Sequence, residues 1–269
     1  MAKMNGRVLI IAGSDSGGGA GIQADIKSVT ALGGFAMTAI TALTAQNTQG
    51  VHGIYEVPAD FVAEQMKVVL DDLGADCIKI GMLHRPEIIE TVIGVLKSHA
   101  PDVPIVADPV MIAKGGHSLL ADAAQDALRS QLLPIATLIT PNLPEAEVLT
   151  GAEIKSADDM PAAAQSLAAL GPKAVLLKGG HLPEDGALVD LLLDDAGELH
   201  SFEDMRIHTA NTHGTGCTLA SATACGIAQG LSIKDAVARA RGYVRDAILS
   251  NPGYGKGHGP LNHAVTVST

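Results

Sequence analysis

The sequence has few aromatic residues and few cysteines. Its 269 residues include no tryptophan, three phenylalanines, three tyrosines and three cysteines. We therefore predict a core of aliphatic side chains, which is sizeable because 47% of the residues are hydrophobic. Cys77, Cys217 and Cys225 form no Cys-x-x-Cys pair, so we expect neither a disulfide framework nor a zinc site, and we expect a reducing, cytoplasmic environment. Cys77 and Cys225 stand in apolar contexts and are predicted to lie in the core.

Long apolar runs and clusters of basic residues are also absent. No stretch approaches the ~20 residues of a membrane span, and the initial MAKMNGR lacks the apolar segment of a signal peptide. The formal net charge is -11, and Lys and Arg do not cluster, which argues against a nucleic-acid partner. We therefore expect an untargeted, soluble protein with no membrane partner. Without a visible linker or repeat, residues 1–269 are predicted to form one domain, with a loosely held tail over residues 251–269.

Short apolar runs alternate with amphipathic stretches along the chain. The runs, which mostly end at Gly, Pro or Asn, cover residues 7–13, 38–45, 77–82, 104–110, 137–142 and 174–180. Helical spacing between them joins Phe61, Met66, Val69 and Leu73 in one stretch, and Ile88, Val92 and Leu96 in the next. This alternation predicts a doubly wound α/β sheet of mostly parallel strands. Residues 188–207 depart from this alternation, because two strands flank the turn DDAG. This pattern predicts an antiparallel hairpin at the edge of the sheet.

Glycine is abundant, with 30 residues, and two glycine-rich turns lead into helices at residues 17–21 and 213–217. Glycine permits a close approach, and a helix N-terminus offers unpaired NH groups to an anion. GAGIQA at residues 19–24 matches a dinucleotide-binding fingerprint, but no acidic residue that would bind a ribose lies between Ile26 and Tyr55. No Gly-Lys-Ser/Thr sequence of a Walker A loop occurs either. The two turns suggest two small ligands, although tight helix packing would also explain the glycines.

Polar residues follow the predicted strands at the edge where doubly wound sheets bind ligands. They are Gln46, Asn47, Asp108, Asn142, Glu145 and Lys178, followed by Thr212, Gly214, Gly216 and Cys217 at the second glycine turn. An amide, two carboxylates, a lysine and a bare helix N-terminus together favour a site for Mg²⁺ and a polyphosphate beside a neutral polar ligand.

Several segments occur in an order and spacing that carry a family resemblance over nearly the whole chain. They are AGSDSGGGAGIQADIK, TALTAQNTQGV, KIGML, DPVM, TPNLPEAEVLTG, LLKGGH and THGTGCTLASA. This set resembles the ribokinase superfamily and, within it, the bacterial hydroxymethylpyrimidine and phosphomethylpyrimidine kinases of thiamine biosynthesis. The resemblance implies a three-layer αβα ribokinase-like fold, ATP and Mg²⁺ as cofactors, and usually a homodimer. It implies phosphorylation of 4-amino-5-hydroxymethyl-2-methylpyrimidine and then of its monophosphate to the diphosphate.

The resemblance also divides the site, with the pyrimidine at the first glycine turn and the nucleotide phosphates at the second. For the substrate it implies Gly13, Ala20, Thr44, Gln46, Met82 and Val110. For the nucleotide it implies Asn142, Lys178, Thr212, Gly214, Thr215 and Gly216, with Asp108 and Glu145 acting on the metal. Gln46 is the main substrate candidate because an amide both donates and accepts, although it could simply cap a strand. Asn142 and Glu145 would also suit the capped start of a helix, and Asp108 could cap a helix.

Cys217 stands where ribokinase relatives carry an aspartate that acts as catalytic base. The resemblance implies that the NH groups of residues 214–217 form an anion hole, with Lys178 neutralising phosphate charge. A thiol has a reference pKa of about 8.5, which a helix N-terminus lowers, so a Cys217 thiolate could accept the hydroxyl proton near neutral pH. The alternative is a small residue that closes the turn. His213 beside it could touch phosphate or lie at the surface.

Two other functions are compatible with the same residues. Pyridoxal kinase is the first, because pyridoxal carries a comparable ring and hydroxymethyl group, but the segments TAQNT and GTGC favour the pyrimidine. A sensor that binds the pyrimidine without catalysis is the second. A sensor needs no phosphate machinery, so Asn142, Glu145 and Lys178 argue against it.

Overall fold

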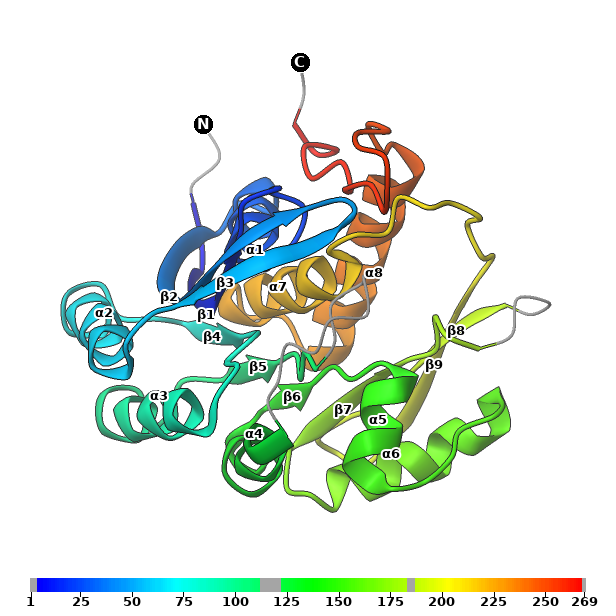
Figure 1. Cartoon of the computed structure of the whole chain (residues 1–269). Helices are drawn as coiled ribbons and strands as arrows, with labels where there is room; N and C mark the ends of the chain where they lie inside the picture. The colour runs from blue at the N-terminus through cyan, green and yellow to red at the C-terminus, as the bar shows by residue number, and fades with distance from the viewer. Residues whose placement is uncertain (1–3, 112–121, 183–186, 268–269) are drawn as a thin grey trace.

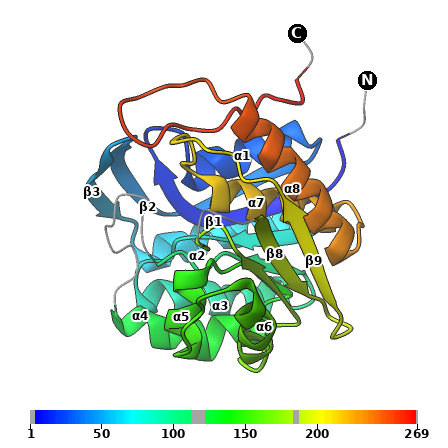
Figure 2. The same cartoon turned by 90° about the vertical axis from the view of Figure 1, so that its right-hand side faces the viewer.

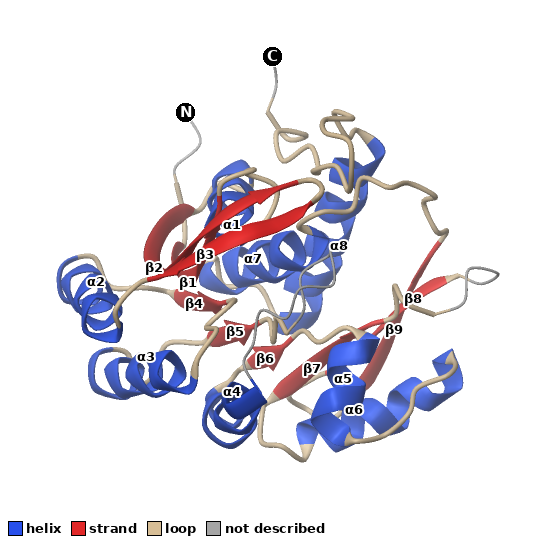
Figure 3. Ribbon diagram, in the orientation of Figure 1, coloured by secondary structure: helices blue, strands red, loops and turns tan. Residues whose placement is uncertain are grey.

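The computed structural model describes residues 4–111, 122–182 and 187–267. In these residues one nine-stranded sheet forms the centre of the molecule (Figures 1 and 3), in the order β3-β2-β1-β4-β5-β6-β7-β8-β9. The strands are β1 (Arg7–Asp15), β2 (Phe35–Asn47), β3 (Gly50–Glu56), β4 (Cys77–Ile80), β5 (Ile105–Ala107), β6 (Leu138–Ile139), β7 (Ala174–Lys178), β8 (Leu188–Leu193) and β9 (Leu199–Asp204).

Helices cover both faces of this sheet. They are α1 (Gly21–Ala31), α2 (Ala59–Asp72), α3 (Pro86–His99), α4 (Asp122–Ala127), α5 (Leu143–Thr150), α6 (Met160–Ala168), α7 (Thr215–Ala228) and α8 (Ile233–Leu249), with the short turns η1 (Leu128–Leu132), η2 (Leu133–Ile135) and η3 (Ala157–Asp159). One aliphatic core lies between the sheet and α1, α7 and α8, and a second lies between the sheet and α2 to α6 (Figures 1 and 2). The predicted three-layer αβα fold is confirmed. None of the helices in the described ranges is long and apolar enough to cross a membrane.

The two edges of the sheet are both antiparallel hairpins. Strands β2, β1, β4, β5, β6 and β7 run parallel, and β8 and β9 form the hairpin predicted for residues 188–207. The hairpin of β2 and β3 at the opposite edge was not predicted. Its turn, Thr48 and Gln49, carries neither the Asn-Gly nor the Asp-Gly pair that marks a tight hairpin in a sequence. Strand β2 (Phe35–Asn47) is longer than the apolar run predicted over residues 38–45.

The predicted helices form, but the face predicted for α2 turns inward only in part: Met66 is buried, and Val69 is partly buried against the core. The buried residues of α2 are Val62, Met66 and Leu70. Phe61 and Leu73 were predicted on that face and are instead 54% and 42% exposed, so the prediction is wrong at these two positions. Two apolar stripes that are shifted by one residue differ by a rotation of only about 100° around the helix axis. The sequence is compatible with both stripes, and packing against the sheet selects one of them. In α3 the predicted residues Ile88, Val92 and Leu96 are buried.

The segment after α8 is packed against the body of the molecule. His258 donates its backbone NH to the carbonyl oxygen of Thr48 at 2.8 Å, and Leu261 and His263 are buried. The loosely held tail predicted from composition is therefore wrong for residues 258–263. Its last two residues, 268–269, lie outside the described part of the chain.

His263 is expected to make stability pH-dependent. Its Nε2 lies 2.9 Å from Thr218 Oγ1, and burial, helped by the charge of Lys27, lowers its pKa to about 4. An unfolded histidine titrates near about 6.5, so the contribution of His263 is complete above that pH and is lost as the pH falls towards 4. We expect the free energy of unfolding to fall by up to about 3 kcal/mol over this window, and the fall to be much smaller in His263→Gln.

Urea unfolding of both proteins at several pH values between 4 and 7 measures this difference. His52→Gln, a change at an exposed histidine on β3, is the matched control and should keep the wild-type pH dependence. The same pH dependence in His263→Gln and wild type would contradict the prediction.

Candidate active site

A cavity of about 820 Å³ lies at the carboxyl ends of the parallel strands. Every residue for which the family resemblance implied a role lines it: Gly13, Ala20, Thr44, Gln46, Met82, Asp108, Val110, Asn142, Glu145, Lys178, Thr212, Gly214, Thr215, Gly216 and Cys217. Asn47, which follows Gln46 at the end of β2, is exposed and is not among the lining residues.

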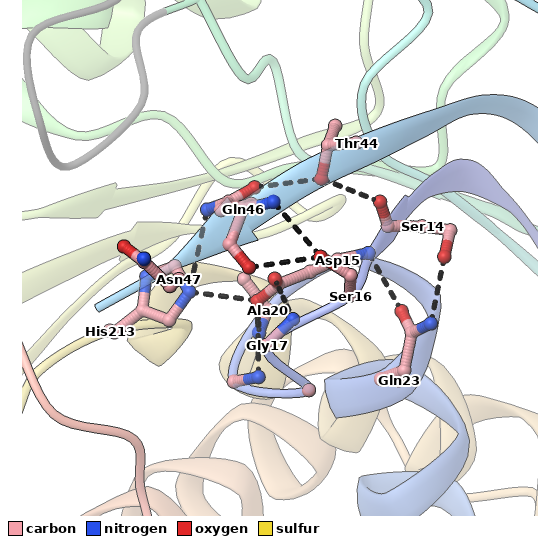
Figure 4. A network of polar contacts seen from close by, with 12 residues as sticks. Ser14, Asp15, Ser16, Gly17, Ala20, Gln23, Thr44, Gln46, Asn47 and His213 are labelled. Atoms are coloured by element: carbon pink, nitrogen blue, oxygen red, sulfur yellow. Dashed lines mark hydrogen bonds and ion pairs between the residues drawn. The ribbon is translucent and has the colours of Figure 1, made fainter. Parts of the chain in front are cut away.

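Asp15, the last residue of β1, shapes the first glycine turn. Its carboxylate accepts the backbone NH groups of Gly17, Gly19 and Ala20 at 2.8, 3.1 and 2.8 Å, and it faces His213 (Figure 4). Burial alone would raise the pKa of Asp15, but the hydrogen bonds from His213 and the turn outweigh it and hold that pKa below its usual value. A buried carboxylate anion therefore organises the turn from inside.

The two glycine turns are in direct contact. His213 Nε2 in the second turn lies 2.8 Å from Asp15 Oδ2 in the first. Gly214 has a positive φ of 83°, and a Cβ there would collide with the carbonyl oxygen of Gly19, so only glycine fits. The surface location considered for His213 is wrong, because the residue is buried between the turns.

Gln46 points its side chain into the cavity between two neighbours (Figure 4). Its amide lies 3.1 Å from Thr44 Oγ1 and 3.5 Å from His213 Nε2. Its backbone NH and carbonyl are both bonded to the Ser16 hydroxyl at 2.9 Å. The turn after β1 and the end of β2 thus hold the amide in place, and the side chain does not cap the strand.

Two apolar side chains form a wall beside Gln46. Met82 follows β4 and packs with Val110, which follows β5, against Ala42 of β2. A Cβ at Gly13 would lie 2.5 Å from the terminal methyl of Met82. The absence of a side chain at Gly13 therefore makes room for this wall and leaves a slot with one polar edge.

Lys178, the last residue of β7, lies at the other end of the cavity. Its Nζ is 2.9 Å from Asp108 Oδ1, which also accepts the Thr140 hydroxyl at 3.0 Å. No side chain caps α7, and a Cβ at Gly216 in its first turn would lie 3.3 Å from Lys178 Nζ. An ammonium group and an uncapped helix N-terminus therefore face the same space, where they can bind an anion.

Asn142 and Glu145 begin α5 as a capping box. The Asn142 NH donates to Glu145 Oε2 at 2.8 Å, and the Glu145 NH donates to Asn142 Oδ1 at 2.9 Å. The capped helix start that we considered for this pair is confirmed. Burial, with the charge of Asp108, raises the pKa of Glu145 to about 7, although Lys178 acts in the opposite direction. Asp108 and Glu145 are both buried and line the same cavity, and carboxylate oxygens are the ligands that a divalent cation such as Mg²⁺ prefers.

Cys217 is half-buried in the first turn of α7. Burial raises the pKa of its thiol to about 11; Lys79 lowers this pKa, and the carboxylates of Asp25 and Asp108 raise it. The predicted lowering of the pKa at the helix N-terminus is therefore wrong. Burial and two negative charges raise the pKa of Cys217 by more than Lys79 lowers it.

The sequence analysis missed a buried ion pair in the cavity wall. Lys79 of β4 places its Nζ 2.9 Å from both carboxylate oxygens of Asp25 in α1, and the Ser221 hydroxyl of α7 donates to the same carboxylate at 2.6 Å. The signal was a lysine within the apolar run CIKIGM, because a charge inside a buried strand needs a partner. The analysis also missed apolar residues that line the cavity beyond Lys178, namely Leu188, Ile207, Leu219, Val244 and Ile248.

The fold and the cavity together define a kinase of the ribokinase-like class. Residues 15–262 match the family model described as phosphomethylpyrimidine kinase, and the chain therefore belongs to this family.

Two curated relatives are similar over almost the whole chain. The thiamine biosynthesis bifunctional protein ThiED of Geobacter sulfurreducens is 51% identical over 97% of this chain, which spans only 52% of that protein. The hydroxymethylpyrimidine/phosphomethylpyrimidine kinase of Streptomyces coelicolor is 48% identical over 95% of this chain and 93% of that protein. The chain thus spans about half the length of the bifunctional relative and nearly all of the other.

Solved structures of two kinds of kinase share the fold. The phosphomethylpyrimidine kinase of Clostridium difficile 630 has a TM-score of 0.80 at 42% identity and covers 90% of this chain and 99% of its own. The pyridoxal kinase of Staphylococcus aureus in complex with ADP has a TM-score of 0.89 at 34% identity and covers 98% and 95%. The fold alone therefore does not choose between the two ring substrates.

Proposed function

We propose that this chain, as one domain, transfers the γ-phosphoryl group of ATP to 4-amino-5-hydroxymethyl-2-methylpyrimidine and then to its monophosphate, in thiamine biosynthesis. The observation that carries the proposal is the contact between the two glycine turns. It brings a slot with one amide edge and an uncapped helix N-terminus into one cavity. A flat ring in the slot then presents its hydroxymethyl group to a phosphate at the helix.

We assign the ring to the slot formed by Gly13, Ala20, Thr44, Gln46, Met82 and Val110. The nucleotide phosphates lie at Asn142, Lys178, Thr212, Gly214, Thr215 and Gly216. The adenine base of ATP lies among the apolar residues beyond Lys178. Phosphoryl transfer passes through a loose transition state, so catalysis rests on positioning and on charge stabilisation. The NH groups at the start of α7 and the Lys178 ammonium stabilise the charge that develops on the transferred group. The Cys217 thiolate accepts the hydroxyl proton.

Glu145 and Asp108 would hold Mg²⁺, directly or through water. The ion, when bound, supplies positive charge to the phosphate oxygens. Its presence would favour the ionised form of Glu145, whose pKa of about 7 otherwise leaves it partly protonated near neutral pH.

We also propose a cytoplasmic homodimer that needs no nucleic-acid or membrane partner. The three cysteines are unpaired, which suits a reducing compartment. Leu43, Ile54 and Tyr55 are exposed on the hairpin of β2 and β3, and an apolar hairpin at a free sheet edge suits pairing with a second copy. Sedimentation at micromolar concentration tests the dimer.

Mass spectrometry of the products tests the activity. Incubation with ATP, Mg²⁺ and the free pyrimidine should yield first the monophosphate and then the diphosphate. A pyridoxal arm run in parallel measures the rival activity, and faster turnover of pyridoxal would overturn the substrate assignment. Binding of the pyrimidine without any phosphorylated product would favour the sensor instead.

Gln46→Ala is expected to raise the KM for the pyrimidine by about 10- to 100-fold, because each lost hydrogen bond to the ring costs about 1–2 kcal/mol, while kcat changes much less. Steady-state kinetics with each substrate varied in turn measure this split. Asn47→Ala, a change at the exposed neighbour, is the control and should leave both constants near the wild-type values. A large loss of kcat at unchanged KM in Gln46→Ala would contradict the binding role.

A further inference from the structure

We propose that Asp190 is a positioning residue for the nucleotide. Its carboxylate joins the turn after Lys178 to helix α8. It thereby sets the width of the adenine slot, which is the apolar part of the cavity beyond Lys178, and the position of the Lys178 ammonium group. This inference rests on the proposed function, which places the base of ATP in that slot. Asp190 is a buried residue of β8 that pairs with Lys178 of β7 and lines the cavity.

The two carboxylate oxygens of Asp190 have partners on different elements. Oδ1 accepts the backbone NH of Gly179 at 3.0 Å, and Oδ2 lies 2.8 Å from Nε of Arg241 in α8. The Arg241 side chain is only 10% exposed, so this charged pair is largely shielded from water, where such hydrogen bonds are strong. One side chain of β8 therefore connects the end of β7 with α8.

Arg241 continues the connection to the second strand of the hairpin. Its Nη2 lies 2.9 Å from Asp204 Oδ2 in β9, and its guanidinium carbon lies 5.2 Å from the centre of the Phe202 ring. About one helical turn later, Nη1 of Arg245 donates to the carbonyl oxygen of Met205 at 2.8 Å. Helix α8 is thus held beside the hairpin of β8 and β9 at two successive turns (Figure 2).

The same face of α8 carries apolar residues of the adenine slot. Four cavity residues of this helix have the spacing i, i+3, i+4 and i+7, which places them along one face: Arg241, Val244, Arg245 and Ile248. Leu188 at the start of β8 and Ile207 after β9 line the cavity from the hairpin. The ion pairs between helix and hairpin therefore set the distance between the two apolar sides of the slot.

The main chain is fixed on both sides of the Lys178 side chain. The Lys178 NH donates to the carbonyl oxygen of Pro141 at 2.9 Å, and the next NH, that of Gly179, donates to Asp190. A Cβ at Gly179 would collide with the carbonyl oxygen of Val189, so the turn lies directly on β8. Loss of the Asp190 carboxylate would release this turn and allow the Lys178 ammonium group to move away from the phosphates.

The ring slot lies in a different part of the sheet. Its residues belong to or follow β1, β2, β4 and β5, and β6 and β7 separate these strands from β8. We therefore expect Asp190 to affect binding of the nucleotide and not binding of the pyrimidine. A general contribution to folding would affect both.

The test compares wild type with Asp190→Asn and Asp190→Leu in steady-state kinetics. Asparagine keeps an oxygen for the Gly179 NH, but its NH₂ group faces Arg241, which is also a donor, so only the bond to α8 is lost. We expect the KM for ATP to rise at least about 5-fold in Asp190→Asn, with kcat near the wild-type value. Leucine loses both bonds, so the KM for ATP should rise at least about 10-fold. Its kcat should fall about 10- to 100-fold because Lys178 is displaced. The KM for the pyrimidine should stay near the wild-type value in both variants.

Two further variants separate this role from folding. Asp195→Asn, at an exposed residue in the turn of the same hairpin, is the matched control and should change neither KM nor kcat. Asp190→Leu combined with Arg241→Met removes the buried guanidinium that the single variant leaves without its carboxylate, so urea unfolding should show recovered stability. The KM for ATP should nevertheless stay raised, because the bonds to Gly179 and α8 are still missing.

Calorimetric titration with ADP measures the same effect without phosphoryl transfer. The dissociation constant should increase from wild type to Asp190→Asn and again to Asp190→Leu. A wild type that binds ADP but phosphorylates neither the pyrimidine nor pyridoxal would refute the proposed function, and the ADP constants of the variants would still decide this inference. Unchanged nucleotide affinity in folded Asp190→Leu, or an equal loss of affinity for nucleotide and pyrimidine, overturns it.

Discussion

Cys217→Ala is expected to lower kcat by about 10²- to 10⁴-fold, the range typical of a lost general base, while both substrates still bind. The variant removes only the group that accepts the hydroxyl proton and leaves the backbone of the anion site in place. Steady-state kinetics and calorimetric binding of the pyrimidine measure the two effects separately. Cys225→Ala, in the buried part of the same helix, is the matched control and should keep the wild-type kcat.

The proposed role of Cys217 also predicts how the rate changes with pH. Because the pKa of the Cys217 thiol is raised to about 11, only a small fraction is thiolate at neutral pH, and that fraction rises tenfold per pH unit. We expect kcat/KM of the wild type to rise between about pH 8 and 10. Cys217→Asp supplies a base that is already ionised, so its profile should be flat there. A wild-type rate in Cys217→Ala would remove the proposed role.

Lys178→Met is expected to lower kcat by about 10²- to 10³-fold, because one preorganised charge facing the transferred phosphate is lost. It should also destabilise the fold by about 3–5 kcal/mol, since the buried Asp108 carboxylate loses its cationic partner. Lys173→Met, at an exposed lysine just before β7, is the control and should change neither quantity.

The double variant Lys178→Met with Asp108→Asn separates the two effects. Neutralising Asp108 removes the unpaired buried charge, so urea unfolding should recover most of the lost stability. The rate should stay low, because the ammonium group and the Asp108 carboxylate that we assign to Mg²⁺ are then both missing from the phosphate end of the cavity. Recovery of kcat together with stability would mean that Lys178 only supports the fold.

The sequence predicted the cavity residues well because parallel strands converge at their carboxyl ends. Gln46, Asp108 and Lys178 stand at the carboxyl ends of separate strands that are far apart in the chain, yet sheet topology alone places them at one edge. Features that depend on tertiary contacts could not be predicted from the sequence. The pairing of Lys79 with Asp25 joins a strand to a distant helix.

Other errors have equally specific causes. The pKa of Cys217 depends on how deeply α7 is buried and on which charges lie near it, and neither follows from its place in the motif. Phe61 and Val62 are neighbours on the same helix, and either can begin an apolar stripe until the sheet is in place. The hairpin of β2 and β3 lacks a recognisable turn pair, so it was not distinguished from the strand before it.

The contact of Gly214 with Gly19 limits which residues can be replaced to change the substrate range. Main-chain atoms of Gly19 and Gly214, rather than rotatable side chains, set the distance between the ring slot and the phosphate site. We therefore expect the alignment of the hydroxyl group with the phosphate to survive replacement of the residues around the ring. Redesign of this enzyme for new heterocyclic alcohols can therefore begin at the floor and edge of the slot, while both glycine backbones are kept unchanged.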